Sequence, residues 1–132
     1  MASVRTLYAA AQAKKAGLLR QRHFQAANGE LMEKVRREAA VIDAEQARQL
    51  ATELGVDLQA IDEKEGLLWW RYGIAVEMEH GTKLSAQTNV TNDNLLVTAR
   101  IALAHIREFP DYYQRLAIME DRAEAYWQRK RG

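Results

Sequence analysis

The feature that most constrains the fold is the scarcity of proline in a sequence rich in helix-forming residues. A single proline, Pro110, occurs in 132 residues, and runs of Ala, Leu, Gln, Glu, Lys and Arg fill most of the rest. These residues favour helices. Apolar residues recur at helical spacing, for example over 95–106, and no segment shows the alternation of a strand. The sequence therefore predicts an all-α fold, a small orthogonal helical bundle with a long N-terminal helical arm.

Capping residues and glycines indicate where the helices begin and end. Asn28-Gly29 is a stop signal, Asp43 and Asp57 are N-cap candidates, and Gly55 is a C-cap candidate. The first expected helices are 3–27, 30–41 and 44–54, followed by a short helical turn after Asp57. Asp62 with Glu65 is expected to open a helix over 62–80, and Asn92 or Asp93 to cap a helix that runs through Ile106. The final helix is expected to have Pro110 at its first position and an apolar stripe of Tyr112, Leu116, Met119, Ala123 and Tyr126.

Charge divides the chain into two expected parts. Residues 1–40 carry eight basic and three acidic side chains, a net charge of +5, whereas the whole chain carries +1, so the remainder carries −4. We therefore predict a basic helical arm at 1–42 and a compact domain at 43–132. The apolar stripe of the arm is thin, which favours contact with a partner. The residues expected to make that contact are Arg5, Leu7, Tyr8, Lys14, Lys15, Leu18, Arg20 and Arg22.

Several classes of function lack their sequence signatures here. The chain has no cysteine, no apolar run long enough for a membrane span, no secretory signal, and no glycine-rich phosphate loop or hydrolase motif. The basic side chains of the arm are spread around its helix without interleaved aromatics, so specific reading of nucleic acid is not expected. These absences favour a non-catalytic protein of a reducing compartment such as the cytoplasm, with no membrane partner.

Two Glu/His pairs form the candidate polar site. Glu77 and His80 lie three residues apart, as do His105 and Glu108, so each pair shares a helix face. One interpretation is a structural joint in which the histidines hydrogen-bond the glutamates where two helices meet. A second is a divalent metal bound by these four side chains, because Glu-x-x-His pairs on two helices are typical of di-metal bundles. A third is acid–base catalysis by the same groups without a metal. Asp111 could add a third carboxylate to such a metal site. The order of the second pair, His before Glu, is the reverse of the di-metal pattern.

Longer motifs resemble a small bacterial and phage family of unknown function. Residues 73–81 match its G-x-x-V-E-x-E-H-G signature, and T-N-V-T-N-D at 88–93 and I-A-L-A-H-I-R-E-F-P-D-Y-Y at 101–113 follow. The resemblance covers about residues 43–121. This sequence departs from the family pattern at Asn94, where an Asp-Pro step is common. The departure weakens the expectation that this loop supplies a carboxylate ligand. The polar residues that the resemblance implies for the site are Glu77, Glu79, His80, His105, Glu108, Asp111, Tyr112 and Tyr113.

Three functions follow as expectations. The first is a non-catalytic structural or protein-interaction protein, encoded by a phage or carried in its particle, which uses the basic arm to join a homo-oligomer or a larger assembly and needs no cofactor. The protein would then reside in the cytoplasm of a bacterial host or in the virion. The second is a helical domain that binds a metal through the Glu/His cluster, with or without an enzymatic role. The third is a nucleic-acid accessory protein whose arm contacts phosphates without reading sequence.

Overall fold

The computed structural model describes residues 29–132. The contact residues expected on the arm therefore lie outside the described residues, and their helix and partners stay predictions. These residues are Arg5, Leu7, Tyr8, Lys14, Lys15, Leu18, Arg20 and Arg22.

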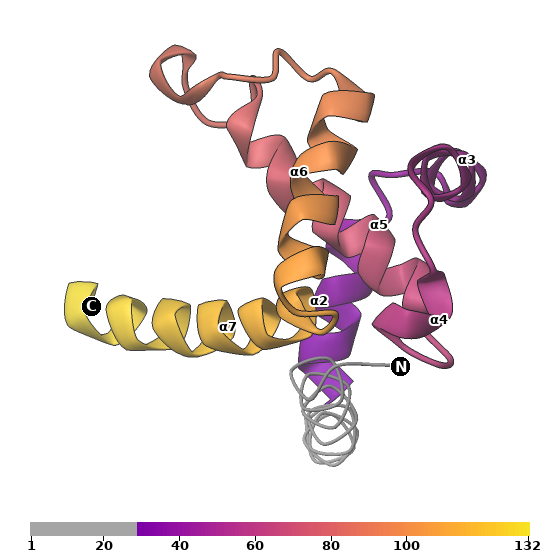
Figure 1. Cartoon of the computed structure of the whole chain (residues 1–132). Helices are drawn as coiled ribbons and strands as arrows, with labels where there is room; N and C mark the ends of the chain where they lie inside the picture. The colour runs from indigo at the N-terminus through magenta and orange to yellow at the C-terminus, as the bar shows by residue number, and fades with distance from the viewer. Residues whose placement is uncertain (1–28) are drawn as a thin grey trace, which may run out of the picture.

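Helices account for the regular structure of the described chain (Figure 1), which contains no strand between residues 29 and 132. The all-α prediction is confirmed. In chain order the elements are α2 (Gly29–Ala39), α3 (Ala44–Leu54), α4 (Leu58–Ile61), α5 (Gly66–Glu77), the 3₁₀ turns η1 (Met78–His80) and η2 (Ala86–Thr88), α6 (Leu95–Glu108) and α7 (Tyr112–Arg131).

Helix α5 is the centre of the bundle, and α2, α3, α4, α6 and α7 all pack on it. Its sequence is apolar around most of its circumference, which is the pattern of a helix buried on every side. Trp70 and Ile74 are completely buried. The indole of Trp70 satisfies its polar edge by donating a hydrogen bond from Nε1 to the carbonyl oxygen of Ala47 on α3, at 2.9 Å. This bond fixes α3 against the central helix.

The boundary of the arm differs from the prediction. Leu31, Val35, Ala39 and Ile42 are all buried in the same core cluster as α5, although 1–42 was expected to form the arm. Residues 29–42 are thus part of the compact body, and only 1–28 remain as a candidate arm. Neighbouring acidic and basic side chains on the outer face of α2 obscured this apolar stripe in the sequence.

The expected caps of the early helices are present. The carboxylate of Asp43 accepts a hydrogen bond from the backbone N–H of Gln46, and that of Asp57 from the N–H of Gln59. Gly55 ends α3 with a left-handed φ of 69°, a conformation that costs glycine little.

Helix α5 begins later than predicted. The carboxylate of Asp62 accepts hydrogen bonds from the backbone N–H groups of Lys64 and Glu65, which closes a turn before the helix. Gly66 is then the first helical residue, and a Cβ there would lie 1.9 Å from the carbonyl oxygen of Leu58. The start of α5 is therefore set by this close approach to α4.

Two later helix starts also differ from the prediction. Asn94, rather than Asn92 or Asp93, caps α6 by accepting from the N–H of Val97. Asn92 and Asp93 instead adopt left-handed φ values of 50° and 62° in the preceding turn. The final helix begins at Tyr112 rather than at Pro110.

The second half of α7 extends beyond the body (Figure 1). Tyr113, Gln114 and Ala117 are buried in its first half, whereas almost every side chain from Asp121 onward is exposed. The stripe predicted along this helix is accordingly divided, because its early members pack on the core while Met119 and Tyr126 face solvent. No helix among residues 29–132 has the length and apolar character needed to cross a membrane.

Candidate functional site

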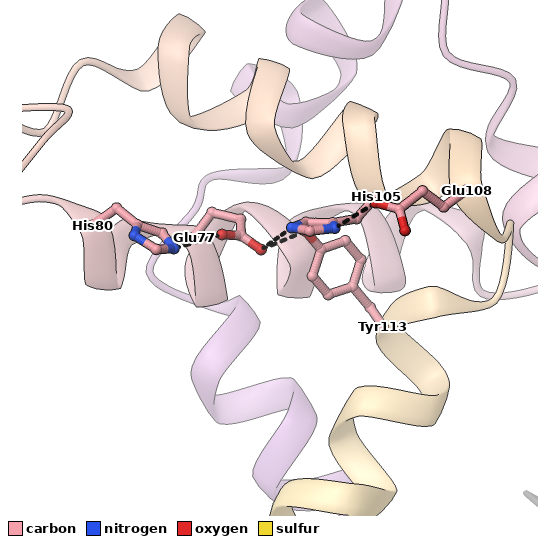
Figure 2. A network of polar contacts seen from close by, with 5 residues as sticks. All are labelled: Glu77, His80, His105, Glu108 and Tyr113. Carbon is pink, nitrogen blue, oxygen red and sulfur yellow. Dashed lines mark hydrogen bonds and ion pairs between the residues drawn. The ribbon is translucent and has the colours of Figure 1, made fainter.

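The candidate site lies where the end of α5 meets α6 and the start of α7 (Figure 2). Glu77 occupies the last turn of α5 and is only 4% exposed. A carboxylate removed from water in this way requires partners that compensate its lost hydration. The surrounding residues supply them from the helices α6 and α7 and from the 3₁₀ turn η1.

Three side chains contact the carboxylate of Glu77. Tyr113 donates a hydrogen bond from its hydroxyl to Oε1, at 2.7 Å. His80 places Nε2 3.2 Å from Oε2, and His105 places Nε2 3.7 Å from Oε1. The other ring nitrogen of His105, Nδ1, lies 3.2 Å from Oε1 of Glu108. Both predicted Glu/His pairs are therefore brought together.

The four side chains form a line rather than a ring. In Figure 2 they run in the order His80, Glu77, His105 and Glu108, and the two imidazoles approach Glu77 from different sides. A metal site instead needs several ligand atoms about 2.0–2.2 Å from one point. The described residues contain no group of three or more His, Cys, Asp or Glu side chains arranged to hold a metal ion. The metal site stays a prediction, which the metal content of protein purified without chelator would test.

Tyr113 reaches Glu77 because α5 carries a glycine where the ring crosses it. A Cβ on Gly73 would lie 2.7 Å from ring atoms of Tyr113, which is closer than van der Waals contact. Burial, and next the negative charge of Glu77, raise the pKa of Tyr113 far above its ordinary value. The phenol therefore stays protonated and remains a donor to the carboxylate.

Tyr112 joins the site through its ring. It stacks on the imidazole of His105 with a centroid separation of 4.3 Å and an interplanar angle of 11°. The edge of Tyr113 meets the same imidazole at 6.2 Å. His105 is thus held by two rings and two carboxylates, which fixes its orientation between α6 and α7.

Two expected site residues have other partners. Asp111 is buried, but its carboxylate pairs with Nε of Arg115 one turn later, at 2.9 Å. Glu79 lies on η1, and its negative charge acts electrostatically on Glu120 of α7. After burial, its charge is the next largest cause of the raised pKa of Glu120. Neither residue contributes a contact to Glu77.

A loop contact next to the cluster was missed by sequence reasoning. Asp93 accepts hydrogen bonds from both the backbone N–H and the hydroxyl of Thr82, and these bonds lower the pKa of Asp93. A Cβ on Gly81 would lie 2.1 Å from Oδ1 of Asp93, so this approach requires glycine. The sequence indicates Asp93 as a helix-cap candidate, and nothing in the polar loop sequence links it to Thr82.

The same loop also returns to His80. The backbone N–H groups of Val90 and Thr91 both donate to the carbonyl oxygen of His80, at 2.6 and 3.0 Å. His80 is therefore anchored through its backbone by the loop and through its side chain by Glu77. This arrangement joins α5 to α6 at one end of the bundle.

Comparison with known proteins places the chain in a family without adding an activity. No curated protein and no solved structure matches it. A family model does match residues 47–122. This range contains the polar cluster, which consists of Glu77, His80, His105, Glu108 and Tyr113. The predicted kinship to a family of unknown function is thereby confirmed: the chain belongs to the family described as protein of unknown function (DUF5661).

Proposed function

We propose that this chain is a non-catalytic protein-interaction protein that assembles with copies of itself through its basic N-terminal segment. The resemblance of its motifs to a bacterial and phage family suggests a bacterial cell or a phage particle as the setting. Three features of the described residues and the sequence support the proposal.

The observation that carries the proposal is the exposed end of α7. Met119, Tyr126 and Trp127 are 54%, 47% and 55% exposed, and the rings of Tyr126 and Trp127 pack edge to face at 5.3 Å. Large aromatic side chains are costly to leave in water, and they are enriched at the energetic centres of protein interfaces. A helix that projects from the body with such residues is suited to contact another protein.

The charge distribution gives the assembly a source of attraction. Residues 1–28 carry five basic and no acidic side chains, whereas residues 29–132 carry a net charge of −4. Oppositely charged parts of neighbouring molecules attract at low ionic strength and are screened by salt. The segment of one copy is therefore complementary to the body of the next.

The polar cluster supports a structural role rather than chemistry of its own. Glu77 is buried and already contacted by Tyr113, His80 and His105. A substrate could reach its carboxylate only by displacing these partners. The cluster is better suited to hold α5, α6 and α7 together.

The test is the molar mass of the full chain in solution, by light scattering, for three proteins. The natural chain should exceed the 15.1 kDa of one copy, and Lys14→Glu/Lys15→Glu/Arg20→Glu should reduce it to a monomer. Lys64→Glu/Lys83→Glu/Arg100→Glu reverses three exposed charges of the body and should leave the assembly unchanged. A natural chain that is monomeric at every concentration, or equal masses for both variants, would overturn the proposal.

A further inference from the structure

We propose that the projecting part of α7, residues 119–131, pairs antiparallel with the same part of a second copy of this chain. This inference rests on the proposed function, because the contact that it describes joins two copies within the assembly. It is carried by the order of the charges along one face of α7 and by the exposed tryptophan at the centre of that face.

Four side chains form a row along this face of α7. Glu120, Glu124, Trp127 and Arg131 follow one another at steps of four, three and four residues, so they share one side of the helix. In an antiparallel pair, Arg131 of the second copy lies opposite Glu120. Trp127 of the second copy then lies opposite Glu124, and each contact occurs twice, as a two-fold interface requires.

The net charge of the projection changes sign along its length. Residues 119–125 carry three acidic side chains and one basic, a net charge of −2, whereas residues 126–132 carry three basic side chains and none acidic, a net charge of +3. Because opposite charges attract and like charges repel, antiparallel pairing is favoured. Parallel pairing would instead bring the two basic ends together.

The remaining arginines of the projection do not oppose this pairing. Arg122 and Arg129 each lie two residues away from a charged member of the row. Two residues correspond to about 200° around the helix axis, so both arginines lie on the side of α7 opposite the row. The charges that face the second copy are therefore those of Glu120, Glu124 and Arg131.

Glu120 carries negative charge that its neighbours do not offset. Burial, and next the negative charges of Glu79, Glu124 and Glu38, raise its pKa. Lys34 of α2 forms its ion pair with Glu124, and among residues 29–132 no basic side chain forms an ion pair with Glu120. A guanidinium group beside Glu120 would compensate this charge.

The end of α7 cannot supply that group to its own chain. Arg131 follows Glu120 by eleven residues on the same helix, which separates them by about 16 Å along the axis. In Figure 1 this end of α7 projects away from the body. Because one chain contains a single α7, the Arg131 that meets Glu120 belongs to a second copy.

Trp127 adds apolar contact to the pair. Its side chain is 55% exposed, and antiparallel pairing places it near the two-fold axis, where the second copy covers the ring. The paired helices overlap by about 20 Å, which gives a small interface compared with those of stable dimers. The contact therefore adds to that of residues 1–28 and does not replace it.

The first test is acrylamide quenching of tryptophan fluorescence in the full chain. Trp69 and Trp70 are buried, so quenching reports mainly on Trp127. At concentrations where light scattering shows assembly, we expect quenching several-fold weaker in the natural chain than in Arg131→Glu. The matched control, Arg129→Glu, makes the same charge change on the opposite side of α7 and should behave like the natural chain. Equal quenching in the natural chain and Arg131→Glu would overturn the inference.

The second test exchanges the two charges. Glu120→Arg alone should expose Trp127 as Arg131→Glu does, because like charges then face each other. Glu120→Arg/Arg131→Glu reverses both members of each ion pair and should restore the protection of Trp127. If residues 1–28 supplied the partner of Glu120, the double variant would stay exposed. A double variant quenched as strongly as the single variants would therefore overturn the inference.

These tests separate the inference from the proposed function. An assembled natural chain in which Trp127 is quenched as strongly as in Arg131→Glu would overturn the inference and leave the proposed function standing. A natural chain that is monomeric at every concentration would overturn both.

Discussion

At the scale of single residues, Tyr113 supplies the hydroxyl that satisfies the buried carboxylate of Glu77. Tyr113→Phe removes this donor but keeps the ring, and leaving a buried charged group short of a partner costs about 1–3 kcal/mol of unfolding free energy. Urea denaturation would measure the loss. Tyr112→Phe is the matched control, because the contribution of Tyr112 to the site is its ring stacked on His105. We expect the control to change stability by about 0.5 kcal/mol or less.

The buried tyrosines also predict how stability depends on pH. Burial is the largest cause that raises the pKa of both Tyr72 and Tyr113 above the ordinary 10.0. The folded protein therefore holds protons that the unfolded chain releases above pH 10, so stability is complete below that pH and falls as the pH rises further. Tyrosinate absorbance should show these two phenols ionising only when the protein unfolds. Their ionisation in a protein that is still folded would contradict this.

The central part of the cluster could be predicted from the sequence because spacing of three residues fixes which helical side chains share a face. That rule placed Glu77 with His80 and His105 with Glu108. It could not decide between competing partners, and Asp111 pairs with Arg115 on its own helix. Tyr113 came from the family resemblance, since its contact with Glu77 spans 36 residues.

At the scale of helices, the crossing of α5 and α7 depends on the missing side chain of Gly73. Gly73→Ala would place a methyl group 2.7 Å from the ring of Tyr113, and overpacking of this kind typically costs about 1–3 kcal/mol. Gly29→Ala is the matched control, because a Cβ at this helical glycine meets nothing within 4 Å. Thermal unfolding should separate the two variants, and equal melting temperatures would show that α7 shifts without cost.

Helix ends were predictable where a cap acts within one turn, as at Asp43 and Gly55. They were not predictable where tertiary contacts choose among neighbouring candidates. Asn94 caps α6 because Asp93 is engaged with Thr82 and Asn92 is in a left-handed turn. Propensity alone does not distinguish these adjacent polar residues.

At the scale of the whole molecule, the position of the core predicts which truncations are tolerated. Removal of residues 1–28 should leave the helical circular dichroism of the body and its cooperative unfolding in place. Removal of residues 1–42 also deletes Leu31, Val35, Ala39 and Ile42 from the core, where each large buried side chain contributes about 1.5–3 kcal/mol. We expect the longer truncation to unfold or aggregate. Equal stability of both truncations would contradict the assignment of α2 to the body.

The all-α class followed from helical periodicity and sparse proline, which are local properties of the chain. The extent of the body did not, because α2 looks like a surface helix until the face of α5 that covers it is known. The sequence also does not show that the second half of α7 projects from the body. Its apolar spacing continues past the last residue that the body can cover.

The two hydrogen bonds from Thr82 to Asp93 restrain how far α6 can slide along α5. Because these bonds hold the loop between η1 and α6 closed, they add a restraint on the axial register of the two helices from outside their interface. A slip of one helical turn would displace α6 by about 5.4 Å and carry His105 out of reach of Glu77. The loop therefore helps to keep α6 at the position in which both His80 and His105 contact the carboxylate of Glu77.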